Sequence, residues 1–256
     1  MIVNLTHNNK NYRADLTNPI DISIPLSTKN NPTAWYVEQP TIKPVQSEGF
    51  IGSVKAGSSV NFRTIFFNPH GHGTHTECVG HINPEITSVN QQVKNFHFFA
   101  LVVTVTPRKI TSKTGTREIG DFIVELDMIQ QLLDTHKPKA LIIRTLPNSE
   151  EKLHKQYSNT NPPYICHKLM EYATNNGVEH FLIDLPSIDK ERDNGELLAH
   201  KAFWNYPENP FYDKTITEFI YVKNEISDGC YLLNLQVAPF ENDASPSRPV
   251  LYPLIG

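Results

Sequence analysis

The chain has few cysteines and no excess of positive charge. It contains 3 Cys in 256 residues, and none forms a CxxC pair. This excludes a disulfide framework and a cysteine-based zinc site, and it favours the reducing cytoplasm as the setting. The 23 Lys and Arg against 27 Asp and Glu give a net charge of -4, so we expect no binding to nucleic acid.

The chain also lacks long apolar segments and internal repeats. Its longest apolar run, residues 98–105 (FFALVVTV), is too short to span a bilayer, so we expect no membrane association. The first residues lack the charged and apolar regions of a signal peptide. Because no low-complexity linker divides the sequence, we expect residues 1–256 to form one domain.

The periodicity of apolar residues predicts a mixed α/β fold. The predicted strands occupy residues 20–26, 59–67, 98–106, 140–144, 181–184, 218–222 and 231–237, and the predicted helices occupy residues 126–133, 163–175 and 196–204. The helix at 163–175 begins with proline and is followed by Gly177, as expected of a helix. Its position between two short apolar strands predicts a βαβ unit.

The most informative segment is FNPHGHGTHTECVGHI, residues 67–82. His75 and Glu77 are two residues apart, so on an extended chain both side chains point to one face, about 7 Å apart. Imidazole and carboxylate bind zinc or manganese without thiolate. The segment therefore predicts a site for a divalent ion such as zinc or manganese.

Other histidines of this segment can join the same site. Gly71 and Gly73 allow the backbone to turn sharply, so that His70 or His72 reaches the ion. His81 lies six residues after His75, close enough in the chain to join the site. One interpretation is a cupin-like oxygenase, because His70, His72 and Glu77 fit the spacing HxH(x4)E.

The cupin pattern fails at its flanks. Thr64 and Pro84 stand where that pattern has glycines, and the predicted helices do not suit an all-β barrel. A non-catalytic metal-binding module is a further alternative.

A second resemblance covers nearly the whole chain. Gly73-Thr74-His75-Thr-Glu77-(x3)-His81 resembles the HxGTHxDxPxH signature of the cyclase family, which includes bacterial kynurenine formamidase and isatin hydrolase. Further similar segments follow in the same order: Asp21-Ile-Ser-Ile-Pro-Leu-Ser27, Trp35, Leu198-Ala-His200, Thr217-Glu218 and Ala244-Ser-Pro-Ser-Arg248-Pro-Val250.

The resemblance implies a fold and a set of roles. It implies a kynurenine formamidase-like swivelling β/β/α fold with a mixed sheet and flanking helices. It also implies one or two divalent ions, with zinc favoured and manganese as the alternative. The implied metal ligands are His70 (with His72 as the alternative), His75, Glu77, His200 and Glu218. His81 would be the general acid/base, and Trp35 would line the substrate pocket.

The chain departs from the family pattern at three places. Glu77 stands where the family has aspartate, and Gly71 stands where it has the first histidine. His70 is preferred as that histidine because it follows Pro69. Cys78-Val79-Gly80 replaces a segment that contains proline, and a nucleophilic role for Cys78 is the less favoured alternative to a buried structural one.

The resemblance also implies an activity. We expect metal-dependent hydrolysis of a C–N bond in a small amide, formamide or cyclic amide, as in arylformamidases, with metal-bound water as the nucleophile. Members of the family commonly form dimers or larger assemblies, so a homo-oligomer is expected as well.

Overall fold

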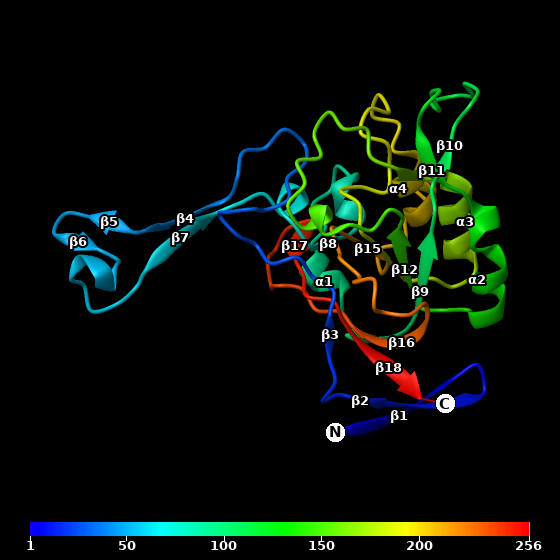
Figure 1. Ribbon diagram of the computed structural model, residues 1–256, viewed down its shortest axis with the longest axis horizontal. Coiled ribbons are helices and arrows are strands. Elements are labelled where there is room, and N and C mark those ends of the chain that lie inside the picture. Colours follow the sequence, from blue (N-terminus) through cyan, green and yellow to red (C-terminus); the bar gives the residue numbers. More distant parts are fainter. Residues whose placement is uncertain (256) are drawn as a thin grey trace.

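A large mixed sheet occupies the centre of the molecule (Figure 1). The computed structural model describes residues 1–255, and its main sheet has 11 strands in the order β1-β2-β18-β16-β9-β12-β14-β15-β8-β17, with β3 paired to β18. The strands are β1 (Ile2–His7), β2 (Lys10–Asp15), β3 (Ile20–Asp21), β8 (His75–Glu77), β9 (His97–Val105), β12 (Ala140–Thr145), β14 (His180–Ile183), β15 (Thr215–Glu218), β16 (Gly229–Asn234), β17 (Ala244–Pro246) and β18 (Val250–Ile255).

Short elements surround this sheet. The remaining strands are β4 (Thr41–Pro44), β5 (Gln46–Ser47), β6 (Phe50–Ile51), β7 (Arg63–Phe66), β10 (Arg108–Lys109), β11 (Phe122–Val124) and β13 (Tyr164–Ile165). The α-helices are α1 (Val89–Gln92), α2 (Gln130–His136), α3 (His167–Asn175) and α4 (Leu198–Trp204). The 3-10 turns are η1 (Val54–Ala56), η2 (Pro69–Gly71), η3 (Val79–His81), η4 (Leu126–Met128) and η5 (Glu150–Leu153). The predicted α/β class with a mixed sheet is confirmed.

The four central strands β9, β12, β14 and β15 are parallel, and both faces of the sheet are covered here. Leu141 and Ile143 of β12 pack in a core with α2, α3 and α4, whereas Ala140 and Ile142 pack in a second core on the opposite face. Strands that are buried on both faces have continuous apolar sequences, which is why these strands could be predicted from the sequence. The predicted βαβ unit is confirmed, since β12 and β14 are adjacent and parallel and α3 lies between them in sequence.

Several predicted elements have other bounds in the structure. The strand expected at 20–26 is limited to β3, and the helix expected at 163–175 begins only at His167, because Tyr164 and Ile165 form β13, which pairs with β11.

The strand expected at 218–222 is β15, which ends at Glu218. Phe219 has a φ of 56°, a left-handed conformation that turns the chain away from the ladder. The apolar residues that follow it are buried in the core without extending the strand, so apolar character alone misplaced the element.

Residues 41–66 form an arm that projects from the body of the molecule (Figure 1). Its stem is the antiparallel pair of β4 and β7, and β5, β6 and η1 lie further out. The strand predicted at 59–67 is therefore β7 of this arm and belongs to a sheet separate from the main one. All four residues of β7 are exposed, and Phe66 is 74% accessible.

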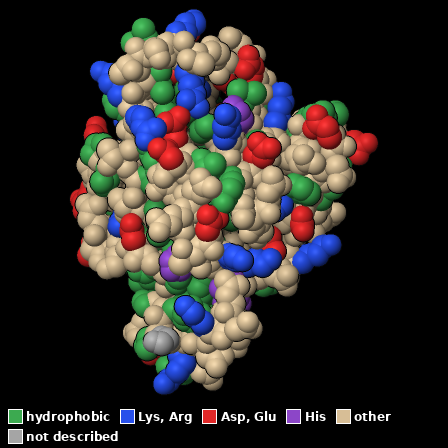
Figure 2. Space-filling model, turned by 90° about the vertical axis from the view of Figure 1, so that its right-hand side faces the viewer, with side chains coloured by type: hydrophobic (Ala, Val, Ile, Leu, Met, Phe, Trp, Pro, Cys, Tyr) green, Lys and Arg blue, Asp and Glu red, His purple; other side chains and the backbone are tan. Residues whose placement is uncertain are grey.

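Two further observations bear on the surface. None of the helices in the described residues has the length and hydropathy that crossing a bilayer requires. On the face shown in Figure 2, Lys and Arg side chains are interspersed with Asp and Glu side chains.

Candidate metal centre

Strand β8 places the central residues of the site between two neighbouring strands. β8 pairs antiparallel with β15 and with β17, and Glu218 of β15 lies directly opposite His75. The turn η2 before β8 carries His70, and the turn η3 after it carries His81. Helix α4 supplies His200. Residues separated by more than a hundred positions thus meet at one end of the parallel strands.

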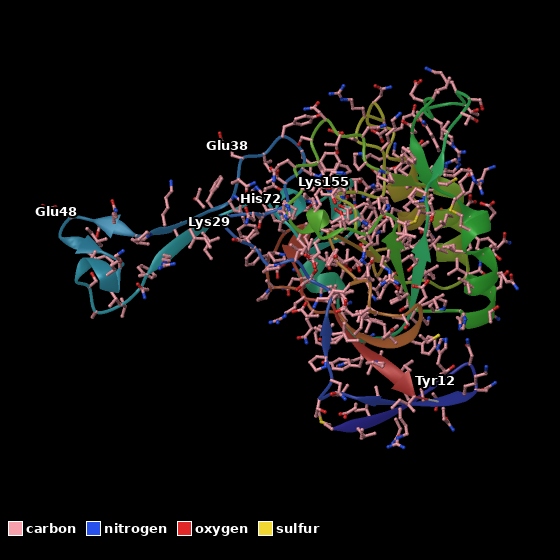
Figure 3. The ribbon with its side chains drawn as sticks, in the orientation of Figure 1. Tyr12, Lys29, Glu38, Glu48, His72 and Lys155 are labelled. Atoms are coloured by element: carbon pink, nitrogen blue, oxygen red, sulfur yellow. The ribbon has the colours of Figure 1, made fainter. Side chains whose placement is uncertain are left out.

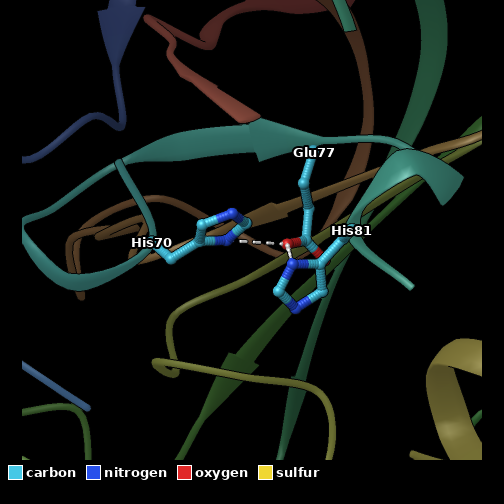
Figure 4. Close-up of side chains that lie close together, drawn as sticks. All are labelled: His70, Glu77 and His81. Atoms are coloured by element: carbon cyan, nitrogen blue, oxygen red, sulfur yellow. Dashed lines mark ion pairs between the residues drawn. The ribbon is translucent and has the colours of Figure 1, made fainter. Parts of the chain in front are cut away.

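Glu77 is the hub of the group, and its side chain is fully buried. Its Oε1 lies 3.0 Å from His200 Nε2. Its Oε2 lies 3.1 Å from His70 Nδ1 and 3.9 Å from His81 Nδ1 (Figure 4). The contact between Oε2 and His70 Nδ1 does not have hydrogen-bond geometry, and Oε2 is left without a hydrogen-bond partner. The histidine nitrogens and this carboxylate therefore face a common point.

His75 and Glu218 complete the inner part of the site. Nδ1–H of His75 donates to the Gly73 carbonyl at 2.9 Å, while its Nε2 lies 3.5 Å from Glu218 Oε2 and has no hydrogen-bond partner. The other Glu218 oxygen, Oε1, accepts the backbone N–H of Ile188 at 3.0 Å. Each side chain is thus anchored by one polar atom and presents the other to the interior of the site.

This donor set fits a divalent cation. Among the described residues, three buried side-chain polar atoms lack a hydrogen-bond partner, and two of them are His75 Nε2 and Glu77 Oε2. Buried polar atoms are seldom left unpaired, and an ion would satisfy both. Two overlapping groups have ligand atoms within 4.8 Å of one another: His70, Glu77 and His81, and His75, Glu77 and Glu218. Imidazole and carboxylate suit zinc and manganese.

Comparison with known proteins identifies the family of this chain. Residues 15–190 match the family described as "Putative cyclase". The chain belongs to the cyclase family. It is 26% identical over 236 residues to the kynurenine formamidase of Bacillus cytotoxicus, and the match covers 92% of this chain and 97% of that protein.

Solved structures share the fold. The predicted metal-dependent hydrolase from Bacillus stearothermophilus superposes with a TM-score of 0.63 at 14% identity, over 92% of this chain and 98% of that one. Isatin hydrolase A from Ralstonia solanacearum gives a TM-score of 0.62 at 14% identity, over 93% and 92% of the two chains. The family resemblance expected from the sequence is confirmed.

The structure separates the two histidine candidates of this cyclase-family chain. Nδ1 of His72 accepts the backbone N–H of Asn68 at 2.7 Å, and its Nε2–H donates to the Glu38 carbonyl at 2.6 Å. Both ring nitrogens are therefore engaged with the backbone, and His72 lies where the arm joins the body (Figure 3). His70, by contrast, faces Glu77. The cupin-like ligand set of His70, His72 and Glu77 is not assembled.

Two carboxylates at the site had not been predicted. Asp189 Oδ2 accepts His200 Nδ1–H at 2.6 Å, and Asp243 Oδ2 accepts His70 Nε2–H at 2.8 Å. Such acceptors fix the ring orientation of metal-binding histidines. Asp243 directly precedes the family-like segment that begins at Ala244, and this position could have indicated it from the sequence. Asp189 lies in a loop with no pattern that marks it.

The charges of the site are strongly coupled. Burial alone would raise the pKa of Glu77, but His81, His200 and His70 outweigh it and hold that pKa well below its usual range. Burial likewise opposes protonation of His70, yet the hydrogen bond to Asp243 and the nearby Glu77 carboxylate raise its pKa to about 10. The pKa of His200 is raised for the same reason by Asp189 and Glu77. The site attracts positive charge, so cations and protons compete for it.

Access to the site is from the side of His81. The His81 side chain is 32% exposed, whereas that of Glu77 is 1% exposed. Trp35 is half-buried in a cluster with Tyr157 and Phe219, and the Phe219 ring centroid lies 6.1 Å from that of His75. Trp35 thus belongs to the apolar cluster that includes Phe219, a neighbour of His75.

Two arginines outside the site have structural partners. Arg144 donates to the carbonyls of Lys223 and Ile226 and to Asp228 at 2.9 Å. Arg248 pairs with Asp21 at 2.7 Å. Neither contacts the candidate metal ligands.

Proposed function

We propose that this chain is a metal-dependent hydrolase that cleaves a C–N bond in a small amide, formamide or cyclic amide. The observation that carries the proposal is the pair of buried, unpartnered atoms His75 Nε2 and Glu77 Oε2, which face a ring of histidines and carboxylates. The family relation to kynurenine formamidase and the fold shared with isatin hydrolase support the same class of reaction.

The proposed ligands are His70, His75, Glu77, His200 and Glu218, with one or two ions and zinc favoured over manganese. A bound divalent cation supplies a Lewis acid and lowers the pKa of a bound water from 15.7 toward about 7. The carboxylates of Glu77 and Glu218 hold the negative charge that retains the cation. The swivelling β/β/α arrangement of the family is part of this proposal.

His81 is the proposed proton carrier. It lies at the exposed edge of the site, and its Nδ1 is 3.4 Å from Asp243 Oδ2, which leaves Nε2 free for a substrate. A histidine in this position can deliver a proton to the leaving nitrogen. Positioned proton transfer contributes about 10²- to 10⁴-fold to the rate. Trp35 and Phe219 would contribute the apolar wall of the substrate pocket.

Chelation tests the proposal directly. The protein is loaded with zinc or manganese and assayed on aryl formamides and lactams, then dialysed against a chelator and reloaded. We expect turnover to disappear with the metal and to return on reloading. His81→Ala should keep the metal content and lose about 10²-fold or more in kcat. Full activity in the chelated protein would contradict the mechanism, and ligand binding without product would favour a non-catalytic module.

We propose a cytoplasmic location, because the cysteines are free. All three are free, and Cys78 and Cys166 are buried. Free cysteines are typical of a reducing compartment, which supports the cytoplasm.

Self-association is proposed for the arm at residues 41–66. Phe62, Ile65 and Phe66 are exposed on it, although apolar side chains are more stable away from water. A second copy of the chain would cover them. We expect the double variant Phe62→Ser, Phe66→Ser to be smaller in sedimentation velocity than the wild type. Ile119→Ser, at an equally exposed residue outside the arm, is the control. A monomeric wild type would contradict the proposal.

A further inference from the structure

Asp243 contacts two histidines with different proposed tasks. Its Oδ2 lies 2.8 Å from Nε2 of His70 and 3.4 Å from Nδ1 of His81. The two imidazole rings are neighbours, with centroids 4.3 Å apart and an interplanar angle of 32°. One carboxylate oxygen therefore lies next to both a candidate metal ligand and the candidate proton carrier.

The backbone around Asp243 is held on both sides. Its carbonyl accepts the N–H of Cys78 at 3.0 Å, and the carbonyl of Asn242 accepts the N–H of Val89 at 2.9 Å. Ala244, the next residue, lies opposite Glu77 in the ladder between β17 and β8. The same strand pairing that places Glu77 thus places the Asp243 carboxylate.

The turn that carries His81 is packed closely against this segment. A Cβ added at Gly80 would overlap the carbonyl oxygen of Thr87 and lie 3.2 Å from Asp243 Cβ. Only glycine allows η3 to approach so near. This approach brings the His81 ring within reach of the carboxylate, so the geometry is built into the fold.

The contacts define which nitrogen of each ring carries a proton. A carboxylate accepts N–H donors only, so the bond to Asp243 places a proton on Nε2 of His70 and leaves Nδ1 facing Glu77. On His81, Nδ1 lies 3.4 Å from the same oxygen without hydrogen-bond geometry; this charge contact favours a proton on Nδ1 and leaves Nε2 available to a substrate. The side chain of Asp243 is 27% exposed, at the rim of the site.

We propose that Asp243 is a positioning residue that orients His70 for the metal and His81 for proton transfer through a single carboxylate oxygen. The inference rests on the function proposed above. It assigns this aspartate a task that is distinct from those of the ligands, because it acts through the two histidines. Removal of Asp243 should therefore affect metal affinity and turnover separately.

Zinc affinity and steady-state kinetics of Asp243→Ala and Asp243→Asn test the inference. Loss of an acceptor behind a metal-binding histidine lowers metal affinity by about 10- to 100-fold, and we expect this for Asp243→Ala. At saturating zinc, its kcat should fall while KM changes little. The neutral amide oxygen of Asn can still accept an N–H, so Asp243→Asn should recover part of both losses. Glu241 lies in the same loop as Asp243, and its side chain accepts hydrogen bonds from Asn90 and Gln91. Glu241→Ala, which removes these contacts, is the matched control.

A double-mutant cycle with His81→Ala distinguishes positioning from a general structural role. In the His81→Ala background, Asp243→Ala should leave kcat unchanged but still weaken zinc binding. Unchanged zinc affinity and kcat in Asp243→Ala would overturn the inference. A spectrum of cobalt-substituted Asp243→Ala that indicates loss of a direct metal ligand would also overturn the inference. Failure of the wild type to bind either zinc or manganese would instead contradict the proposed function.

Discussion

Glu77 and His200 lie 123 positions apart in the chain, yet Glu77 Oε1 and His200 Nε2 are 3.0 Å apart in the buried interior. The other oxygen of the same carboxylate faces His70 and His81. Glu77 thus spans the site from the β8 side to helix α4. The extra methylene of glutamate, compared with the aspartate of the family signature, provides this reach.

The first prediction concerns this reach. Glu77→Asp withdraws the carboxylate by one methylene, so contacts to His70 and His200 cannot both be kept. We expect zinc affinity to fall by roughly 10-fold or more, as measured by competition with a chromophoric chelator. Glu85→Asp, at an exposed glutamate after the histidine segment, should bind like the wild type. Wild-type affinity in Glu77→Asp would show that the longer arm is not required.

A second prediction separates His70 from His72. His70→Ala removes an imidazole that faces Glu77, so metal content after dialysis should fall. His72→Ala removes hydrogen bonds to Asn68 and Glu38 and should keep the metal while lowering the melting temperature. Metal analysis by mass spectrometry and thermal unfolding measure the two effects. Loss of metal in His72→Ala alone would reverse the assignment.

A third prediction concerns Cys78 beside the site. Burial raises the pKa of its thiol to about 11, and its Sγ donates to the Thr87 carbonyl at 3.4 Å. A protonated, buried thiol is a poor nucleophile. Cys78→Ala should therefore keep kcat within about threefold, and iodoacetamide at pH 7.5 should leave Cys78 unmodified in the folded protein. Complete inactivation of Cys78→Ala, with its metal content intact, would point to a nucleophilic role.

A fourth prediction concerns acid stability. Burial lowers the pKa of His180 to about 3, with the lysines Lys214 and Lys139 acting in the same direction. The unfolded chain titrates near 6.5, so between these values it binds one more proton than the folded protein, and stability falls as the pH falls.

Comparison with His180→Gln isolates this effect. From pH 6 to pH 4, the unfolding free energy of the wild type should fall relative to that variant by about 1.4 kcal/mol per pH unit. Urea unfolding of both proteins in the presence of a chelator measures it, with His154→Gln at an exposed histidine as the control. A difference between wild type and His180→Gln that does not vary with pH would refute the assignment.

The sequence was sufficient for the centre of the fold and for the segment that carries the site. Central parallel strands are buried on both faces, so they appear as uninterrupted apolar runs such as 140–144. The helix between them has a polar face and ends at Asn175 as predicted, but it begins at His167, four residues after the predicted start. The glycine-flanked histidines and Glu77 stood close together in the chain. Their spacing alone indicated chemistry that required a metal.

The tertiary structure decided the rest. Only the pairing of β15 with β8 brings Glu218 opposite His75, and only the docking of α4 brings His200 to Glu77. Phe219 ends β15 by adopting a left-handed conformation, which no apolar pattern announces. The preference for His70 over His72 as a candidate ligand depends on the contacts that their imidazole nitrogens make in the folded chain. The same holds for the positions of Asp189 and Asp243 beside the site. Such contacts join distant segments, whereas the periodicity of a sequence reports only on its neighbours.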